Sequence, residues 1–251
     1  MSVTKGLEGI VAAASSISSI NDGILTYRGY NIDNLAEFAS FEEVVHLLWY
    51  GKLPNAAELE DLHKQLIASA SIPGQVIDLL RAAPPKANSM SVLRTAVSAL
   101  SLYDPEANDM SVDANQRKAI RLQAQLPTIV AAFARIRERK EPIAPKADAS
   151  IAHNFLYMLS GKDPEPIAIQ ALDKALVLHA DHELNASTFS ARVTVATLSD
   201  IYSGVTSAIG TLKGPLHGGA NEAVMAMLEE IGSEANVESY IQEKLNSRAK
   251  I

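Results

Sequence analysis

Hydrophobic residues recur every three to four positions along most of this chain, which is the period of an amphipathic helix. Met90, Leu93, Val97 and Leu100 share one helical face, and a comparable pattern resumes after Asp163. No internal repeat, low-complexity tract or long linker interrupts the succession. The pattern therefore predicts helix following helix with short connectors.

Local residue types mark where some of these helices begin and end. Residues 40–43 (SFEE) and 55–58 (NAAE) are capping-box patterns, which are typical of helix N-termini. Gly51 is suited to end the helix that begins after the first of these boxes. The periodic segment from about 113 to 140 contains Pro127, which should kink or split that helix.

The first thirty residues hold the one pattern that is typical of strands. Asp22-Gly23 is a dipeptide favoured in tight hairpin turns, and it lies between SSISSI and ILTYRGY, both rich in strand-forming residues. We therefore predict an all-α fold, in which a multi-helix body carries a small N-terminal β-hairpin.

Composition narrows the class of function. The 251 residues are 47% hydrophobic and carry a net charge of −7, which argues against binding nucleic acid because phosphate contacts need clustered Lys and Arg. The absence of cysteine excludes disulfides and thiolate chemistry and fits a reducing compartment. No apolar run approaches the roughly 20 residues that span a bilayer. We expect a cytoplasmic protein without membrane association.

Two histidines lie close together in the segment HADHELNAS. His179 and His182 are three positions apart, so on a helix they would share a face, with Asp181 and Glu183 beside them. Two imidazoles near a carboxylate could also bind a metal ion, although the HExxH pattern of metalloproteases is absent. The pattern alone leaves both interpretations open.

A third histidine, His217, lies in the glycine-rich segment LKGPLHGGANEAV, ahead of a predicted amphipathic helix that ends at Gly232. The positive end of a helix disfavours imidazolium, so a neutral ring there could donate a hydrogen bond to a carbonyl oxygen that gains negative charge. The alternative is a tight turn in which the histidine only fills a gap.

GPLHGGANEAV, with HADHELNAS upstream, resembles the citrate synthase family, which joins an acyl-CoA to oxaloacetate. Further segments fall in the family's order: GLEGI, LTYRGYNI, FEEVVHLLWYGKLP, SVLRTAVSAL, PTIVAAFARI, FLYML and SARVTVATLSDIYSGV. The resemblance covers nearly the whole chain. It implies the helical large domain of that family.

The resemblance also implies roles for five residues. His217 would donate a hydrogen bond to the thioester carbonyl during enolisation, and His182 would bind oxaloacetate. Asn185 and Ser187 would flank this site, with the serine hydroxyl orienting the catalytic imidazole, and His179 would be a supporting neighbour. Acetyl-CoA and oxaloacetate would be the substrates, with no metal and no cofactor beyond the coenzyme A thioester itself.

The family comparison further implies a homodimer whose two-fold interface includes residues 186–212. It assigns residues 1–232 to the large domain and 233–251 to the start of the small domain. The family's Gly-His-Arg motif, catalytic aspartate and later arginines would lie beyond Ile251, so we expect residues 1–251 alone to be inactive. Asn88-Ser89 stands where the family commonly has His-Pro.

Three other hypotheses compete with citrate synthesis. A 2-methylcitrate synthase would share every motif named above and would accept propionyl-CoA. A non-catalytic helical module for dimerisation or ligand binding would keep the fold without turnover. A metallohydrolase centred on His179, His182 and His217 is a more distant alternative.

Overall fold

The computed structural model describes residues 13–247, apart from the side chains of residues 220–223. Two strands, β1 (Ser18–Asn21) and β2 (Ile24–Tyr27), form the predicted antiparallel hairpin, and a short β3 (Tyr30–Asn31) extends it. Asp22 and Gly23 form the turn with φ angles of +51° and +79°, which explains the choice of these two residues. The hairpin prediction is confirmed, whereas β3 was not predicted.

Helices and the loops that connect them make up the rest of the described chain, as predicted. The α-helices are α1 (Ile32–Phe38), α2 (Phe41–Tyr50), α3 (Ala56–Ser69), α4 (Gly74–Ala82), α5 (Ser89–Leu100), α6 (Val112–Arg137), α7 (Ile151–Ser160), α8 (Pro166–Leu178), α9 (Ala186–Ala196), α10 (Ile201–Leu212), α11 (Gly219–Ile231) and α12 (Val237–Asn246). Two short 3₁₀ helices, η1 (Ser101–Tyr103) and η2 (Glu234–Asn236), connect some of them. No helix of the described chain is both long and apolar enough to cross a membrane.

The predicted helix boundaries have the expected physical basis. Both capping boxes are present, since Ser40 and Asn55 each accept the N–H three residues on, and Glu43 and Glu58 each accept the N–H of the cap. Gly51 ends α2 in the left-handed conformation, with φ of +79°. Local sequence therefore fixes the ends of α2 and the start of α3.

The long helix α6 runs through Pro127 without a break, so the predicted split is wrong. The neighbouring Thr128 donates to the carbonyl of Ala70 at 2.9 Å, and Gln125 donates to that of Ser71 at 3.0 Å. These bonds tie the proline-containing turn to the C-terminal end of α3. Tertiary contacts thus hold the helix where the missing proline N–H weakens it.

The helix α6 contributes side chains to two hydrophobic clusters of buried residues. One cluster joins α4, α5, α6 and α10, and Tyr202 at the start of α10 is one of its largest buried side chains. The other joins the hairpin, α1, α2, α3, α6 and α8, and the fully buried Tyr27 belongs to it. The hairpin is therefore built into a core and does not stand apart from the helices.

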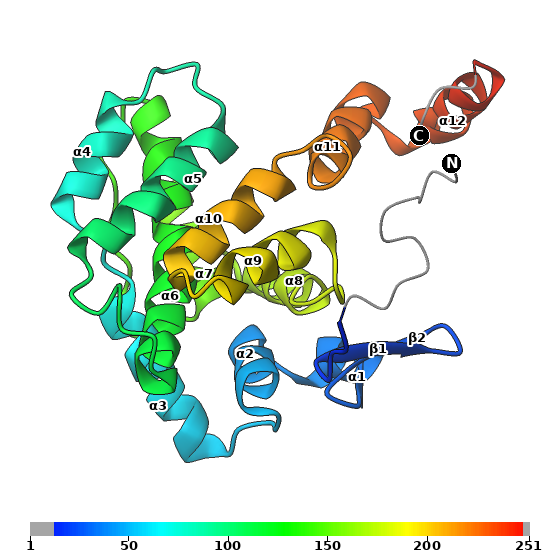
Figure 1. The fold of residues 1–251 in the computed structure, drawn as a ribbon. Coiled ribbons are helices and arrows are strands. Elements are labelled where there is room, and N and C mark those ends of the chain that lie inside the picture. The colour runs from blue at the N-terminus through cyan, green and yellow to red at the C-terminus, as the bar shows by residue number, and fades with distance from the viewer. Residues whose placement is uncertain (1–12, 248–251) are drawn as a thin grey trace, which may run out of the picture.

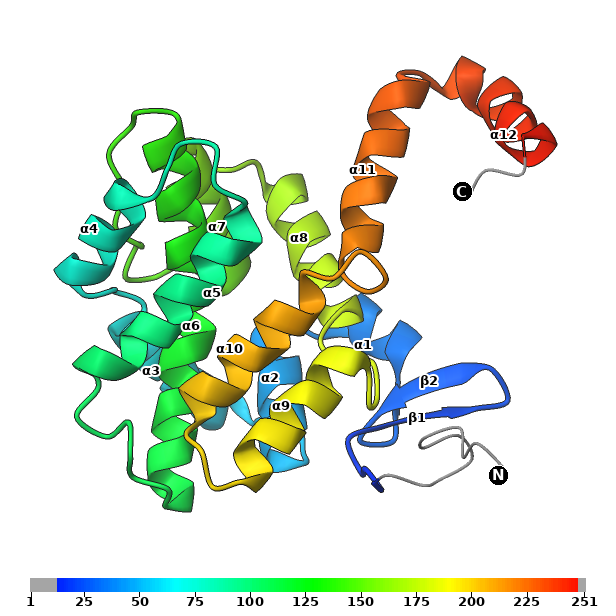
Figure 2. The same ribbon diagram turned by 45° about the horizontal axis from the view of Figure 1, so that its top comes forward.

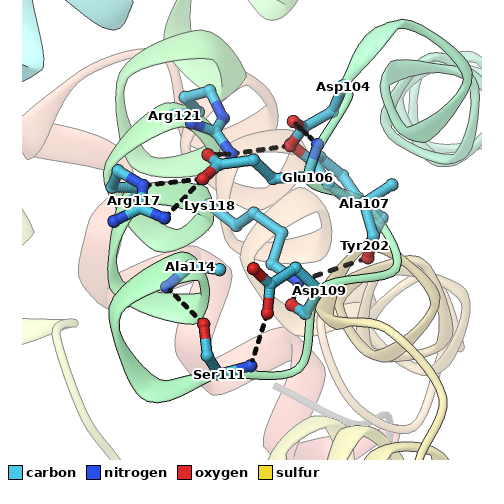
Figure 3. A network of polar contacts seen from close by, with 10 residues as sticks. All are labelled: Asp104, Glu106, Ala107, Asp109, Ser111, Ala114, Arg117, Lys118, Arg121 and Tyr202. Carbon is cyan, nitrogen blue, oxygen red and sulfur yellow. Dashed lines mark hydrogen bonds and ion pairs between the residues drawn. The ribbon is translucent and has the colours of Figure 1, made fainter.

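A polar network fixes the loop that leads from α5 to α6 (Figure 3). Asp104 accepts hydrogen bonds from the Tyr202 hydroxyl at 2.5 Å and from Arg121 at 2.8 Å. Burial alone would raise the pKa of Asp104, but these donors and the N–H of Glu106 outweigh it and hold its pKa below the ordinary value. The fully buried Lys118 donates to the loop carbonyl of Asp109 at 2.6 Å. The network thereby anchors the start of α10, whose other end leads to the candidate site.

The last two helices lie apart from the main helical body in both views (Figures 1 and 2). Gly232 ends α11 as predicted, with φ of +68°, and η2 and α12 follow. The apolar side chains of Met225 and Leu228 on α11 are exposed.

Candidate active site

His217 lies in the turn between α10 and α11, directly ahead of the helix, as predicted. The N–H of Gly218 donates to the carbonyl of Leu212, and that of His217 donates to the carbonyl of Gly214, both at 3.0 Å. A Cβ added to Gly218 would lie 2.3 Å from the Leu212 oxygen, which is far too close. The turn therefore requires glycine at this position, and it presents the half-buried imidazole next to α9.

Ser187 lies in the first turn of α9, beside the imidazole of His217. Its Oγ is 2.7 Å from Nε2 of His217 and 3.1 Å from the carbonyl oxygen of Ala208 on α10. The close packing of α9 on α10 brings these three groups together. Two motifs that are separate in the sequence thus meet through one hydroxyl group.

The hydroxyl of Ser187 has one hydrogen to donate and two possible acceptors, the carbonyl oxygen of Ala208 and Nε2 of His217. The acceptor that it bonds sets the tautomer of His217. If the hydroxyl donates to Ala208, Nε2 must carry the imidazole hydrogen and donate to Ser187. If the hydroxyl donates to Nε2, the hydrogen of the neutral ring lies on Nδ1, which can then donate to another molecule. The shorter contact is the one to the imidazole.

A cavity of about 660 Å³ opens beside this pair, between α9, α10 and the start of α6. Most of its wall is formed by apolar side chains, including Ala191, Val195 and Val205, and His217 and Ser187 also line it. None of the described residues that line it is acidic. Within the described wall, the arrangement offers a hydrogen-bond donor but no carboxylate base.

His179 and His182 do not share a helical face, so that prediction is wrong. The helix α8 ends at Leu178, and His179 is its C-cap, with Nδ1 2.7 Å from the carbonyl oxygen of Ala175. His182 follows in a loop, where its side chain is exposed and makes no hydrogen bond to another described residue. The left-handed conformation of Glu183, with φ of +53°, is incompatible with a continuing helix.

Asn185 connects the loop of His182 to the helix of Ser187. As the N-cap of α9, its Oδ1 accepts the N–H of Thr188 at 3.0 Å, while its Nδ2 lies 3.5 Å from the carbonyl oxygen of His182. The structure therefore brings Asn185, Ser187 and His217 together around the start of α9, with His182 in the adjoining loop. His179 lies before them in the sequence, at the end of α8, and makes its hydrogen bond to that helix.

Two hairpin residues also reach this loop, and the sequence analysis missed them. Ser18 and Tyr27 both contact Asp181, from which they are separated by 163 and 154 positions. No local pattern marks a contact between segments so far apart.

The described residues contain no group of three or more histidine, aspartate or glutamate side chains that could hold a metal ion. In particular, His179, His182 and His217 do not converge on one point. The geometry of these three residues gives no support to the metallohydrolase hypothesis.

Comparison with known proteins gives a consistent result. The model of the family described as "Citrate synthase, C-terminal domain" matches residues 6–251. Citrate synthase 2 of Bacillus subtilis is 58% identical over 252 residues, covering 100% of this chain and 68% of the relative. A 2-methylcitrate synthase of Mycobacterium tuberculosis is 45% identical over 251 residues, covering 99% and 63%.

Solved structures show the same likeness. Citrate synthase of Thermoplasma acidophilum, solved in a ternary complex with carboxymethyl coenzyme A and oxaloacetate, has a TM-score of 0.90 at 32% identity, over 99% of this chain and 66% of that one. Citrate synthase of Thermotoga maritima has a TM-score of 0.84 at 40% identity, over 100% and 66%. The chain thus spans about two thirds of the length of these relatives.

Proposed function

This chain belongs to the citrate synthase family of acyltransferases, and from that premise we propose that the full-length enzyme condenses acetyl-CoA with oxaloacetate to give citrate and coenzyme A. By full-length enzyme we mean these residues together with the third of the family's length that they do not span. Coenzyme A enters as part of a substrate, and the proposed chemistry asks for no metal.

The observation that carries this proposal is the 2.7 Å contact between Ser187 Oγ and His217 Nε2. When Ser187 donates to Nε2, the neutral ring holds its hydrogen on Nδ1 and can donate it to the thioester carbonyl. A donor fixed in advance stabilises the enolate oxygen as charge develops, because it need not reorganise during the reaction. In this arrangement the Ser187 hydroxyl donates its only hydrogen to Nε2, so it makes no strong hydrogen bond to the carbonyl of Ala208.

The remaining steps need groups beyond this pair. A carboxylate must remove a proton from the acyl carbon, and the enolate carbon then attacks the oxaloacetate carbonyl before the thioester is hydrolysed. Asp181 is an unsuitable base because its carboxylate already accepts from Ser18 and from the N–H of Glu183. We assign the base to the family's downstream aspartate, and residues 1–251 alone should therefore release no coenzyme A above background.

We assign His182 to oxaloacetate, because its exposed ring is free of hydrogen bonds to other described residues and lies in the loop joined by Asn185 to the helix of Ser187. Asn185, Ser187 and His179 have supporting roles in this proposal. Residues 1–232 form the large domain and 233–251 begin the small one, with Gly232 at the boundary. Location in the cytoplasm stays a prediction from the sequence.

A homodimer also belongs to the proposal. The helix α9 exposes Phe189 and Val193, which are four positions apart and so share one face, and Leu198 beyond it is 82% exposed with φ of +63°. Large apolar side chains that stay exposed over small-residue helices favour close packing against a second copy.

The test is the rate at which the full-length enzyme releases coenzyme A thiol when both substrates are present. We expect turnover with acetyl-CoA and oxaloacetate, at a higher kcat/KM than with propionyl-CoA. A preference for propionyl-CoA would establish 2-methylcitrate synthesis instead. Binding of oxaloacetate without any thiol release would favour the non-catalytic module.

A further inference from the structure

The β-hairpin directs two side chains at a single residue of the His182 loop. Ser18 on β1 and Tyr27 on β2 are direct cross-strand partners, so their side chains point to the same face of the hairpin. The Ser18 hydroxyl donates to Oδ2 of Asp181. The Tyr27 hydroxyl lies 3.1 Å from the carbonyl oxygen of Asp181 and 3.3 Å from its N–H nitrogen.

Asp181 in turn shapes the backbone around His182. Its Oδ2, the atom that accepts from Ser18, also accepts the N–H of Glu183 at 2.9 Å. This bond closes an Asx-turn with His182 at its centre, and Glu183 is held in the left-handed region with φ of +53°. The backbone of His182 is therefore set by a turn whose acceptor is itself bound to the hairpin.

The hairpin is a rigid base for this contact. The ring of Tyr27 is fully buried in the cluster shared with α2, α3 and α8. Arg28, the next residue, donates to the carbonyl of Leu48 on α2 at 2.9 Å. A buried tyrosine hydroxyl is costly unless it is hydrogen-bonded, and the partners that Tyr27 finds are the backbone groups of Asp181 and Leu178.

We propose that Ser18 and Tyr27 are positioning residues for His182, which they hold in place for oxaloacetate through the Asp181 turn. The inference rests on the proposed function, because it assigns His182 to that substrate. Neither residue touches the substrate or the acyl thioester. Their loss therefore weakens oxaloacetate binding and leaves the binding of acetyl-CoA by the free enzyme unchanged.

The test compares Ser18→Ala and Tyr27→Phe with Ser19→Ala in the full-length enzyme. Ser19 is a matched control, since it neighbours Ser18 but its hydroxyl contacts Thr26 within the hairpin at 2.9 Å. Removing one buried hydrogen-bond partner should raise the KM for oxaloacetate by about tenfold for Tyr27→Phe, and by about threefold for the half-buried Ser18. Ser18→Thr, which keeps the hydroxyl, should restore the wild-type KM.

Amide hydrogen exchange gives a second readout that does not depend on turnover. Exchange at Asp181 and Glu183 should be about tenfold faster in Tyr27→Phe than in Ser19→Ala, because the hydroxyl that accepts from the Asp181 N–H is lost. A role confined to stability would instead lower the active fraction and leave the KM for oxaloacetate as it was.

The outcomes separate this inference from the proposed function. A wild-type enzyme that neither binds oxaloacetate nor releases thiol contradicts the proposed function. If the wild type is active and both variants keep the oxaloacetate KM of Ser19→Ala, the positioning role is wrong. An unchanged exchange rate at Asp181 and Glu183 in Tyr27→Phe also overturns it.

Discussion

Ser187 Oγ and His217 Nε2 lie 2.7 Å apart, so the first turn of α9 holds the imidazole that follows α10. The same hydroxyl lies 3.1 Å from the carbonyl oxygen of Ala208. One serine therefore controls both where the ring lies and which of its nitrogens carries hydrogen. This relationship makes the catalytic proposal testable without a bound substrate.

Ser187→Ala should lower kcat by about 10- to 100-fold, the usual cost of losing a partner that orients a functional histidine. The cause would be a ring that shifts toward the tautomer with hydrogen on Nε2, so that Nδ1 no longer donates. Nitrogen-15 chemical shifts of His217 would report the tautomer, and steady-state kinetics would report kcat. An unchanged kcat together with a changed tautomer would rule out donation by Nδ1.

His182→Ala should raise the KM for oxaloacetate by roughly 10- to 100-fold, as expected for loss of a hydrogen bond to a charged ligand. The KM for acetyl-CoA should change little. His153→Ala is a suitable control, since His153 lies on α7 and its ring contacts Asp163 at 3.4 Å. Equal effects of the two substitutions would remove His182 from the binding site.

Glu42→Gln should stabilise the fold at neutral pH. Glu42 is 4% exposed and accepts the N–H of Ile151 at 2.7 Å, a bond that the glutamine oxygen can keep. Burial raises the pKa of Glu42, so the folded chain binds its proton more tightly than the unfolded chain does. The charged, buried carboxylate therefore lowers the free energy of unfolding at pH values above the pKa that Glu42 has in the folded chain. This destabilisation is lost as the pH falls through that pKa.

Thermal unfolding from pH 8 to pH 4 would check this sign. At neutral pH and above we expect a Tm for Glu42→Gln that is higher by about 2–4 °C, the shift that roughly 1 kcal/mol gives a chain of this size. The difference should shrink as the pH falls through the raised pKa of Glu42. Glu42→Ala, which leaves the Ile151 N–H without its acceptor, should lower Tm throughout, and a pH-independent gain for Glu42→Gln would contradict the explanation.

Val193→Glu should convert a dimer to monomers. Val193 is 54% exposed on α9, and a carboxylate on a packed helix face would be desolvated without a partner. Ile167→Glu is the matched control, since Ile167 is 72% exposed but lies on α8. Light scattering at micromolar concentration would give the masses, and a wild type that is already monomeric would disprove the interface.

Features with a local cause could be predicted from the sequence. Asp22-Gly23 specified the hairpin turn, the capping boxes specified α2 and α3, and the glycine-rich motif placed His217 ahead of a helix. Helical periodicity, by contrast, could not show that α8 ends before His179. The helix is followed by the Asp181 turn, and the hairpin residue that binds this turn lies more than a hundred residues away in the sequence, where no local pattern can reveal it.

Tertiary contacts account for the other differences. Pro127 is tolerated in α6 because Thr128 and Gln125 donate hydrogen bonds to the end of α3. No residue pattern around Pro127 predicts these two bonds. Spacing alone likewise gave no pairing between Ser187 and His217. That pairing was expected from the family resemblance, and its geometry comes from the packing of α9 on α10.

The most direct test of the central claim, that His217 donates to the thioester carbonyl, is the kcat for thiol release by His217→Ala in the full-length enzyme. Removing one preorganised donor to the enolate should lower kcat by about 10²–10³. The KM for oxaloacetate should stay within about twofold of the wild-type value, because the substitution leaves unchanged the interactions that bind ground state and transition state equally. A variant that turns over acetyl-CoA and oxaloacetate at the wild-type kcat would contradict the role assigned to His217 and with it the mechanism proposed here.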